Sequence, residues 1–375
     1  MTKLEFQRLL TPLVDIMNNI ELDMIHNILN RIENYNDVKG TLKWLTDKLN
    51  ETKLLDKDNL KILKNNKKEL EKVIRDLAEN CGNYIENFDN LEKYYNKGLL
   101  DINPVELYDS VSINNLINEA IKDTDDIMNL IQTKAIEGAN EEYKNILNKA
   151  YIETASGVYA YQESIKNALD EFSKKGISAV HYKNGKSLSI ESVTRRDVMT
   201  RMNKLVGDVE LQHAKELNTN LVYVDQHLGA RVRTPYTKED YEVHAEWQGK
   251  KYMIEGSNDK YDNLYEKTGY GEMLGLKGIN CYHNMRPTWE WEEIPPQIDL
   301  EKNKQQYEKL QQMRAYERKL RNLKRERIIN KIEENKTKYT KSNKKLSEVS
   351  KKYNNWLKEN DLTRNYNREY VSDRK

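Results

Sequence analysis

The stretch from His227 to Arg286 constrains the fold more than any other part of the chain. It holds seven of the fifteen glycines, a density that no regular helix tolerates, because glycine in a helix interior costs about 1 kcal/mol relative to alanine. It also holds four side chains that bind metals or transfer protons in other proteins: His227, His244, Cys281 and His283. We therefore expect one compact, irregular region here, in a chain that elsewhere reads as a succession of charged helices.

The composition agrees with this division. Charged residues make up 33% of the chain and the nine apolar types only 37%, which is low for a single thick core. Long helices with one buried stripe each fit these proportions, and 375 residues suffice for two or three structural units. The predicted fold class is α+β but mostly α-helical: a helical N-terminal arm, a small central α+β module and a basic helical C-terminal tail.

Residues 1–176 form the predicted N-terminal assembly arm. Its apolar residues recur at helical spacing; Thr11-Pro12 predicts a helix start, Gly138 predicts a break, and Lys175-Gly176 predicts a helix end. The segment contains no candidate catalytic cluster. Helices this polar gain their stability chiefly through packing, so we expect the arm to dock against other subunits.

Residues 177–294 form the predicted central α+β module. Two short strand-like runs flank Asn184-Gly185, which is the strongest short-range hairpin signal. The apolar run Leu221–Asp225 predicts a buried strand, and Lys251–Glu255 is its expected partner. The module therefore contains both strands and the glycine-rich stretch.

Residues 295–375 form the predicted basic tail. Residues 301–375 carry 23 Lys+Arg against 11 Asp+Glu, although the whole chain has a net charge of +1. Such an asymmetry indicates an interaction segment. Two partners remain open: packaged DNA, whose phosphates bind lysine and arginine, and an acidic protein surface, including the chain's own first 300 residues. Glutamates such as Glu308 and Glu317 interrupt the basic charge, which favours a solvated helical hairpin or protein docking over DNA.

The two cysteines, Cys81 and Cys281, lie in unrelated contexts, so we expect no disulfide and a reducing compartment. We find no signal-peptide pattern and no run of 18 apolar residues. These observations predict a protein that is neither secreted by the usual route nor membrane-spanning.

Four ordered motifs in the central module are specific enough to suggest a family. They read His227-Leu-Gly-Ala-Arg231, His244-Ala-Glu-Trp247-Gln248-Gly249, Gly269-Tyr270-Gly271 and Asn280-Cys281-Tyr282-His283. In these motifs, and in further segments along nearly its whole length, the chain resembles the phage minor capsid protein 2 family, relatives of the head-morphogenesis proteins of tailed phages. The residues that the resemblance marks are His227, Gly229, Arg231, His244, Trp247, Gln248, Gly249, Gly269, Gly271, Asn280, Cys281 and His283.

Two positions depart from the family pattern. Tyr282 stands where the family has an arginine, and an insertion lengthens the loop between Arg231 and His244. The resemblance implies a structural, non-enzymatic minor capsid protein in several copies per virion, made in the host cytoplasm and built into the head near the portal. It further implies the portal protein, the major capsid protein or both as partners, and a role in head morphogenesis or DNA delivery.

The His/Cys cluster admits three interpretations. The first is a hydrogen-bonded structural knot that needs no cofactor, and the sequence favours it because an irregular region must satisfy its own backbone groups. The second is a zinc site formed by His227, His244, Cys281 and His283. The third is catalysis, with Cys281 as a nucleophile or with His227, Arg231 and Glu246 acting on phosphate, as in a nuclease or a nucleotide-transfer enzyme.

The knot interpretation makes a geometric prediction. If the two predicted strands pair, their ends bring His227 and His244 together, and the returning loop that carries Cys281 closes over them. Arg231 is then expected to hold loop carbonyls through its five donors. Trp247 is expected to be either a core residue or a contact residue, while Trp289 and Trp291, in an acidic segment, are expected at a contact surface.

Overall fold

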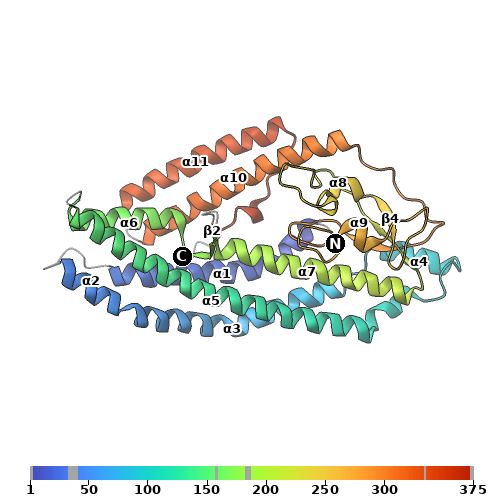
Figure 1. Cartoon of the computed structure of the whole chain (residues 1–375), viewed down its shortest axis with the longest axis horizontal. Coiled ribbons are helices and arrows are strands. Elements are labelled where there is room, and N and C mark those ends of the chain that lie inside the picture. The colour runs from blue at the N-terminus through green and yellow to red at the C-terminus, as the bar shows by residue number, and fades with distance from the viewer. Residues whose placement is uncertain (1–2, 33–40, 157–158, 182–186, 333–334, 372–375) are drawn as a thin grey trace. The chain divides into compact units, whose positions relative to one another are not determined.

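The computed structural model describes residues 3–32, 41–156, 159–181, 187–332 and 335–371, and most of these residues are helical (Figure 1). Short antiparallel strands account for the β content, so the expected mostly helical α+β class is confirmed. The turn predicted at Asn184-Gly185 lies outside the described residues.

The helices and strands have the following bounds. The longer helices are α1 (Lys3–Ile32), α2 (Thr41–Asn50), α3 (Thr52–Gly82), α4 (Phe88–Asn96), α5 (Val111–Ala155), α6 (Tyr161–Lys175), α7 (Ile190–Glu216), α10 (Leu300–Ile332) and α11 (Lys336–Glu359). The short helices are α8 (His244–Trp247) and α9 (Leu264–Thr268), with 3-10 segments at Pro104–Asp109, Asp240–Glu242 and Tyr366–Arg368. The strands are β1 (Ser178–His181), β2 (Ser187–Ser189), β3 (Leu221–Val224), β4 (Lys250–Met253) and β5 (Met285–Thr288).

The chain divides into two compact units. Unit 1 consists of Met1–Leu10, Lys72–Ile127 and Arg196–Gln312, and unit 2 consists of Thr11–Glu71, Met128–Arg195 and Met313–Lys375. Each unit takes residues from all three segments expected from the sequence. The assignment of separate roles to residues 1–176, 177–294 and 295–375 stays a prediction.

The predicted helix start at Thr11-Pro12 is wrong. Helix α1 begins at Lys3 and contains Pro12 in its interior. A proline there removes one backbone hydrogen bond. The side chains on both sides, Leu10 and Leu13, are fully buried, so apolar burial of about 1.5–3 kcal/mol for each such side chain offsets this loss.

The break predicted at Gly138 is also wrong, because α5 runs through this residue without interruption. Gly138 has a packing role instead. A Cβ atom at this position would clash with the backbone carbonyl oxygen of Ser178 in β1. Glycine therefore lets α5 lie close to the backbone of β1, within unit 2.

Gly138→Ala is expected to destabilise the protein by about 1–3 kcal/mol, because the added methyl group overpacks this contact. The sign of the stability change is informative, because a glycine-to-alanine substitution at an open position inside a helix stabilises the protein by about 1 kcal/mol. Chemical denaturation measures the sign and the size of this change in stability. Thr133→Ala, at an exposed position of α5, is the control and is expected to change stability by no more than about 0.5 kcal/mol. A stabilising Gly138→Ala would show that the close approach is not required.

Unit 1 is built on a three-stranded sheet with the order β4-β3-β5. The expected pairing is confirmed: β3 pairs antiparallel with β4, with Leu221 opposite Met253. All four residues of β3 are buried, and Ala214 of α7 packs in the same apolar cluster as Val222 and Val224. The sequence did not predict β5. Its Pro287 fits an edge strand, where a missing N–H group is tolerated.

The predicted basic tail forms the helices α10 and α11. The part of α10 that belongs to unit 2, from Met313 onward, lies beside α11 (Figure 1). The rings of Tyr316 and Tyr353 stack between them, with centroids 5.1 Å apart. The pair is thus the helical hairpin expected from the sequence.

Several arginines of this tail are used inside the protein. Arg321 pairs with Glu191 at 3.3 Å and Arg325 with Glu21 at 3.4 Å. Burial alone would raise the pKa of Glu191, but the charges of Arg321 and Arg195 hold it below its usual value. For Glu21, burial prevails over Arg325 and raises the pKa. Part of the basic charge therefore binds acidic residues of the chain's own earlier segments, one of the two partners left open by the sequence.

Candidate functional site

The sheet of unit 1 positions the three motifs that contain histidine. His227 follows β3, His244 opens the one-turn helix α8 just before β4, and Cys281 and His283 immediately precede β5. Because β4 and β5 lie on either side of β3, these chain segments meet at one end of the sheet.

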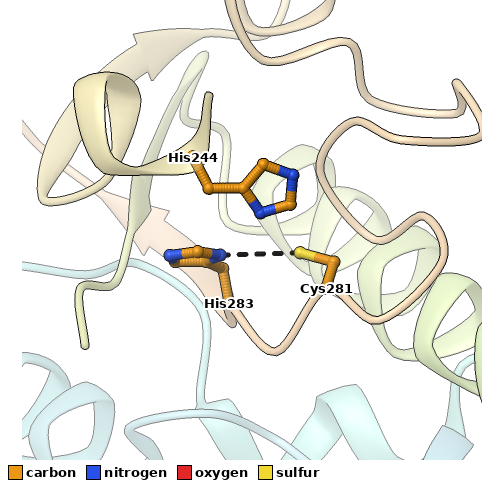
Figure 2. A group of neighbouring side chains, drawn as sticks. All are labelled: His244, Cys281 and His283. Carbon is orange, nitrogen blue, oxygen red and sulfur yellow. Dashed lines mark hydrogen bonds between the residues drawn. The ribbon is translucent and has the colours of Figure 1, made fainter. Parts of the chain in front are cut away.

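Three of the four predicted ligand-type side chains come together (Figure 2). One ligand-type atom each of His244, Cys281 and His283 lies within 4.8 Å of the other two. The Sγ atom of Cys281 is 3.5 Å from Nδ1 of His283. All three side chains are buried. His227 lies beside this set: its ring stacks on that of His283, with centroids 4.4 Å apart, and its Nδ1 is 3.2 Å from the Leu228 carbonyl oxygen.

Hydrogen bonds on the outer side of the two histidines determine where their protons lie. Nε2 of His244 is 2.9 Å from the carbonyl oxygen of Leu274, which can only accept. Nε2 of His283 is 2.9 Å from Oε1 of Gln248, and the same oxygen accepts the backbone N–H of His227 at 3.0 Å. Both Nε2 atoms must therefore donate, and in the neutral rings both Nδ1 atoms carry a lone pair.

Arg231 joins the first motif to the glycine-rich loop. Its guanidinium donates to the carbonyl oxygen of Leu274 and to that of Ile279, each at 2.7 Å, and its own carbonyl accepts from the N–H of Ala245 at 3.0 Å. This is the geometry expected of Arg231, because the loop has few ladder partners for its backbone groups.

Trp247 lies in the core under the cluster. It is 1% exposed, and its indole N–H donates to the carbonyl oxygen of Tyr241 at 2.8 Å. Its ring centroid is 4.5 Å from that of His244 and 4.8 Å from that of His283. Of the two interpretations left open for Trp247, the structure places it in the core.

The other two tryptophans of the region form an aromatic patch. Trp289 and Trp291 stack with their centroids 5.5 Å apart, and both meet Tyr94 edge-on. Trp291 is 48% exposed, while Trp289 packs against an apolar cluster of unit 1. Exposure at Trp291 agrees with the contact surface expected there.

The motif glycines serve backbone geometry. Gly229, at φ +83°, packs against Leu310, and Gly269, at φ +59°, ends α9 in the left-handed conformation. Gly249 and Gly271 also have positive φ, as does Asn280 at 56°, a conformation that asparagine tolerates better than most residues.

Sequence reasoning missed Asn303 of α10, which is fully buried. Its Oδ1 accepts the N–H groups of Gly229 and Ala230, each at 2.9 Å, and its Nδ2 donates to the Ala230 carbonyl oxygen at 3.0 Å. Asn303 thereby anchors the first motif to the start of α10. A single asparagine in a polar helical sequence carries no signal that would have identified it.

The protein environment favours the uncharged forms of the three side chains of the cluster. Burial, then the nearby Arg231, lowers the pKa of His244 to about 3. Burial also lowers the pKa of His283 well below its usual value and raises that of the Cys281 thiol. Two neutral imidazoles and a thiol, closed off from solvent, are placed to hydrogen-bond or to bind a metal cation.

Comparison with known proteins identifies the family to which the chain belongs. Residues 2–358 match the model of the family described as "Phage minor capsid protein 2". The chain is 29% identical over 236 residues to a protein named "Structural protein" from Lactococcus phage LL-H, over 60% of this chain and 61% of that relative. The chain thus spans about three fifths of that relative's length. No solved structure matches.

Across the described residues, no helix combines the length and the apolar character needed to cross a membrane.

Proposed function

Because the chain belongs to the phage minor capsid protein 2 family, we propose that it is built into the phage head at or near the portal, in several copies. There it assists head morphogenesis or DNA delivery, with the portal protein, the major capsid protein or both as partners. The match over nearly the whole chain carries this proposal, because it includes the helices of both units as well as the four motifs. Assembly takes place in the host cytoplasm, and the virion is the protein's final location.

The aromatic patch of Tyr94, Trp289 and Trp291 is the contact surface that we propose for a partner subunit. Tryptophan is enriched among the few residues that contribute most of the binding energy at protein interfaces. Trp291 combines this exposure with a position fixed by stacking on Trp289, so little side-chain freedom remains to be lost on binding.

The chain is expected in density-purified virions at a constant ratio to the portal protein, measured by quantitative mass spectrometry. Trp291→Ala is expected to lower that ratio at least several-fold, because truncating an interface tryptophan costs about 2 kcal/mol or more. Tyr236→Ala is the control, since Tyr236 is 88% exposed in the same unit but outside the patch. Detection in infected-cell lysate and never in particles would contradict the head proposal. Equal incorporation of both variants would contradict only the patch.

The alternative function, a phage-encoded nuclease or nucleotide-transfer enzyme, has less support. His244, Cys281 and His283 are 1–3% exposed, and a substrate cannot reach side chains buried to this degree without local opening. Glu246, proposed with His227 and Arg231 to act on phosphate, is 3.8 Å from Arg233 in a solvent-exposed ion pair.

One surface favours a second role, contact with packaged DNA. Exposed lysines recur on α11 at spacings of three, four, ten and eleven residues from the first, which places them along one face of the helix. We call this set the α11 lysine stripe: Lys341, Lys344, Lys345, Lys351 and Lys352. The buried residues Val349, Tyr353 and Leu357 occupy the opposite side. A stripe of this kind fits a phosphate backbone, which binds through charge and not through base sequence.

A further inference from the structure

We propose that His244, Cys281 and His283 bind one zinc ion, which links α8 to the end of the glycine-rich loop. The proposal concerns the stability of unit 1 and goes beyond any role in the head. It holds whichever subunit the chain contacts.

The spacing of the three side chains fits a zinc site. Zinc binds thiolate sulfur at about 2.3 Å and imidazole nitrogen at about 2.0–2.1 Å, so a tetrahedral site sets sulfur and nitrogen about 3.5 Å apart. Sγ of Cys281 and Nδ1 of His283 are 3.5 Å apart. The whole set lies within 4.8 Å, so a shift of His244 on the order of 1 Å completes the triangle.

The direction of the lone pairs fits as well. Because both Nε2 atoms donate to oxygens of Leu274 and Gln248, the lone pairs of His244 and His283 lie on Nδ1. Figure 2 shows the inner ring nitrogen of each histidine facing Cys281. A thiol has one proton and can donate to only one of the two nitrogens. A zinc ion, in contrast, accepts both lone pairs and the thiolate.

The outer hydrogen bonds are those that zinc-binding histidines make in general. A ligating imidazole usually donates its other N–H to a carbonyl or carboxylate oxygen, which orients the ring and fixes its tautomer. Here Leu274 and Gln248 supply those oxygens. Gln248 is itself held, since its backbone carbonyl accepts from Nε2 of Gln297 at 2.8 Å.

The three side chains supply three of the four ligands of a tetrahedral zinc site. His227 stacks on His283 and does not belong to the set of converging atoms. Because the set is buried, the ion's role is structural: it links position 244 to position 281. Such a link stabilises the folded state by the free energy of metal binding, since the unfolded chain lacks a preformed site.

The test is elemental analysis of the full-length protein purified from zinc-supplemented cells. About one zinc per chain is expected in the wild type, and less than about a tenth of that in Cys281→Ser or His283→Asn. Cys81→Ser is the matched control, because Cys81 is a fully buried thiol of the same unit outside the cluster. It is expected to keep its zinc, and so is His227→Asn.

A second measurement tests the metal site if Cys281→Ser or His283→Asn does not fold. In Cys81→Ser, Cys281 is the only thiol, because the chain has two cysteines. Replacing zinc by cobalt in this variant is expected to produce the charge-transfer absorption of a cobalt–thiolate bond. Absence of both zinc and this absorption, or full zinc retention in folded Cys281→Ser, would overturn the proposal.

Discussion

Trp247→Ala is expected to lower the free energy of unfolding by about 3–5 kcal/mol, the range for removing a buried large aromatic side chain. Trp247 is 1% exposed and belongs to the apolar cluster that includes Val222 and Leu264. The substitution also leaves the carbonyl oxygen of Tyr241 without the indole donor that now bonds it at 2.8 Å. Both the lost burial and the lost hydrogen bond destabilise the protein. A buried acceptor without its donor costs about 1–3 kcal/mol, because its desolvation is no longer compensated.

Urea or thermal denaturation of the full-length protein measures this loss. Trp291→Ala removes the same atoms at a position that is 48% exposed, and it is expected to cost less than about 1.5 kcal/mol because about half of the residue's surface stays in water on folding. Similar losses in the two variants would contradict the assignment of Trp247 to the core. A large loss at Trp291 alone would mean that the aromatic patch, and not the region under the His/Cys cluster, stabilises unit 1.

Replacing the five residues of the α11 lysine stripe by glutamine is expected to abolish most of the chain's affinity for duplex DNA. Each lysine that neutralises a phosphate contributes about 0.9 to the slope of log affinity against log salt. The slope is therefore expected to fall by up to about 4.5, and the affinity in low salt to fall at least about tenfold. Fluorescence anisotropy with DNA of unrelated sequences, at several salt concentrations, measures both quantities.

The control removes the same charge from a different helix. Exposed lysines also occur on α3, at Lys53, Lys57, Lys61, Lys64 and Lys68, and their replacement by glutamine is expected to change the salt slope by less than about 1. Equal effects of the two variants would indicate general charge attraction and not a DNA-binding face. If the wild type does not bind DNA even at low salt, the tail serves protein docking alone, in line with its pairs to Glu21 and Glu191.

Much of the central site was predictable from local sequence. The pairing of Leu221–Val224 with Lys250–Met253 was predictable, because these segments contain the two short apolar runs that predicted strands in this region, and a buried strand needs a partner for its backbone hydrogen bonds. The bonds from Arg231 to Leu274 and Ile279 followed from an arginine beside a loop without ladder hydrogen bonds. The helical tail followed from periodicity, and the end of α6 at Gly176 followed from glycine's tolerance of a positive φ.

Other features depend on contacts between residues distant in sequence, and no local pattern contains them. Pro12 lies within a helix because burial of Leu10 and Leu13 outweighs one lost hydrogen bond. Gly138 looked like a helix break, yet it permits the close approach of β1. The strand β5 escaped prediction because it is four residues long and contains Pro287.

The sequence by itself determined that His227, His244, Cys281 and His283 belong to one region, since the motifs that carry them surround two strands expected to pair. Only the tertiary structure decided that three of them converge, with His227 stacked outside. That outcome depends on the rotation of each ring, which Leu274, Gln248 and the core position of Trp247 fix. Side-chain direction is set by packing and hydrogen bonds from distant segments, and these exist only once the chain has folded.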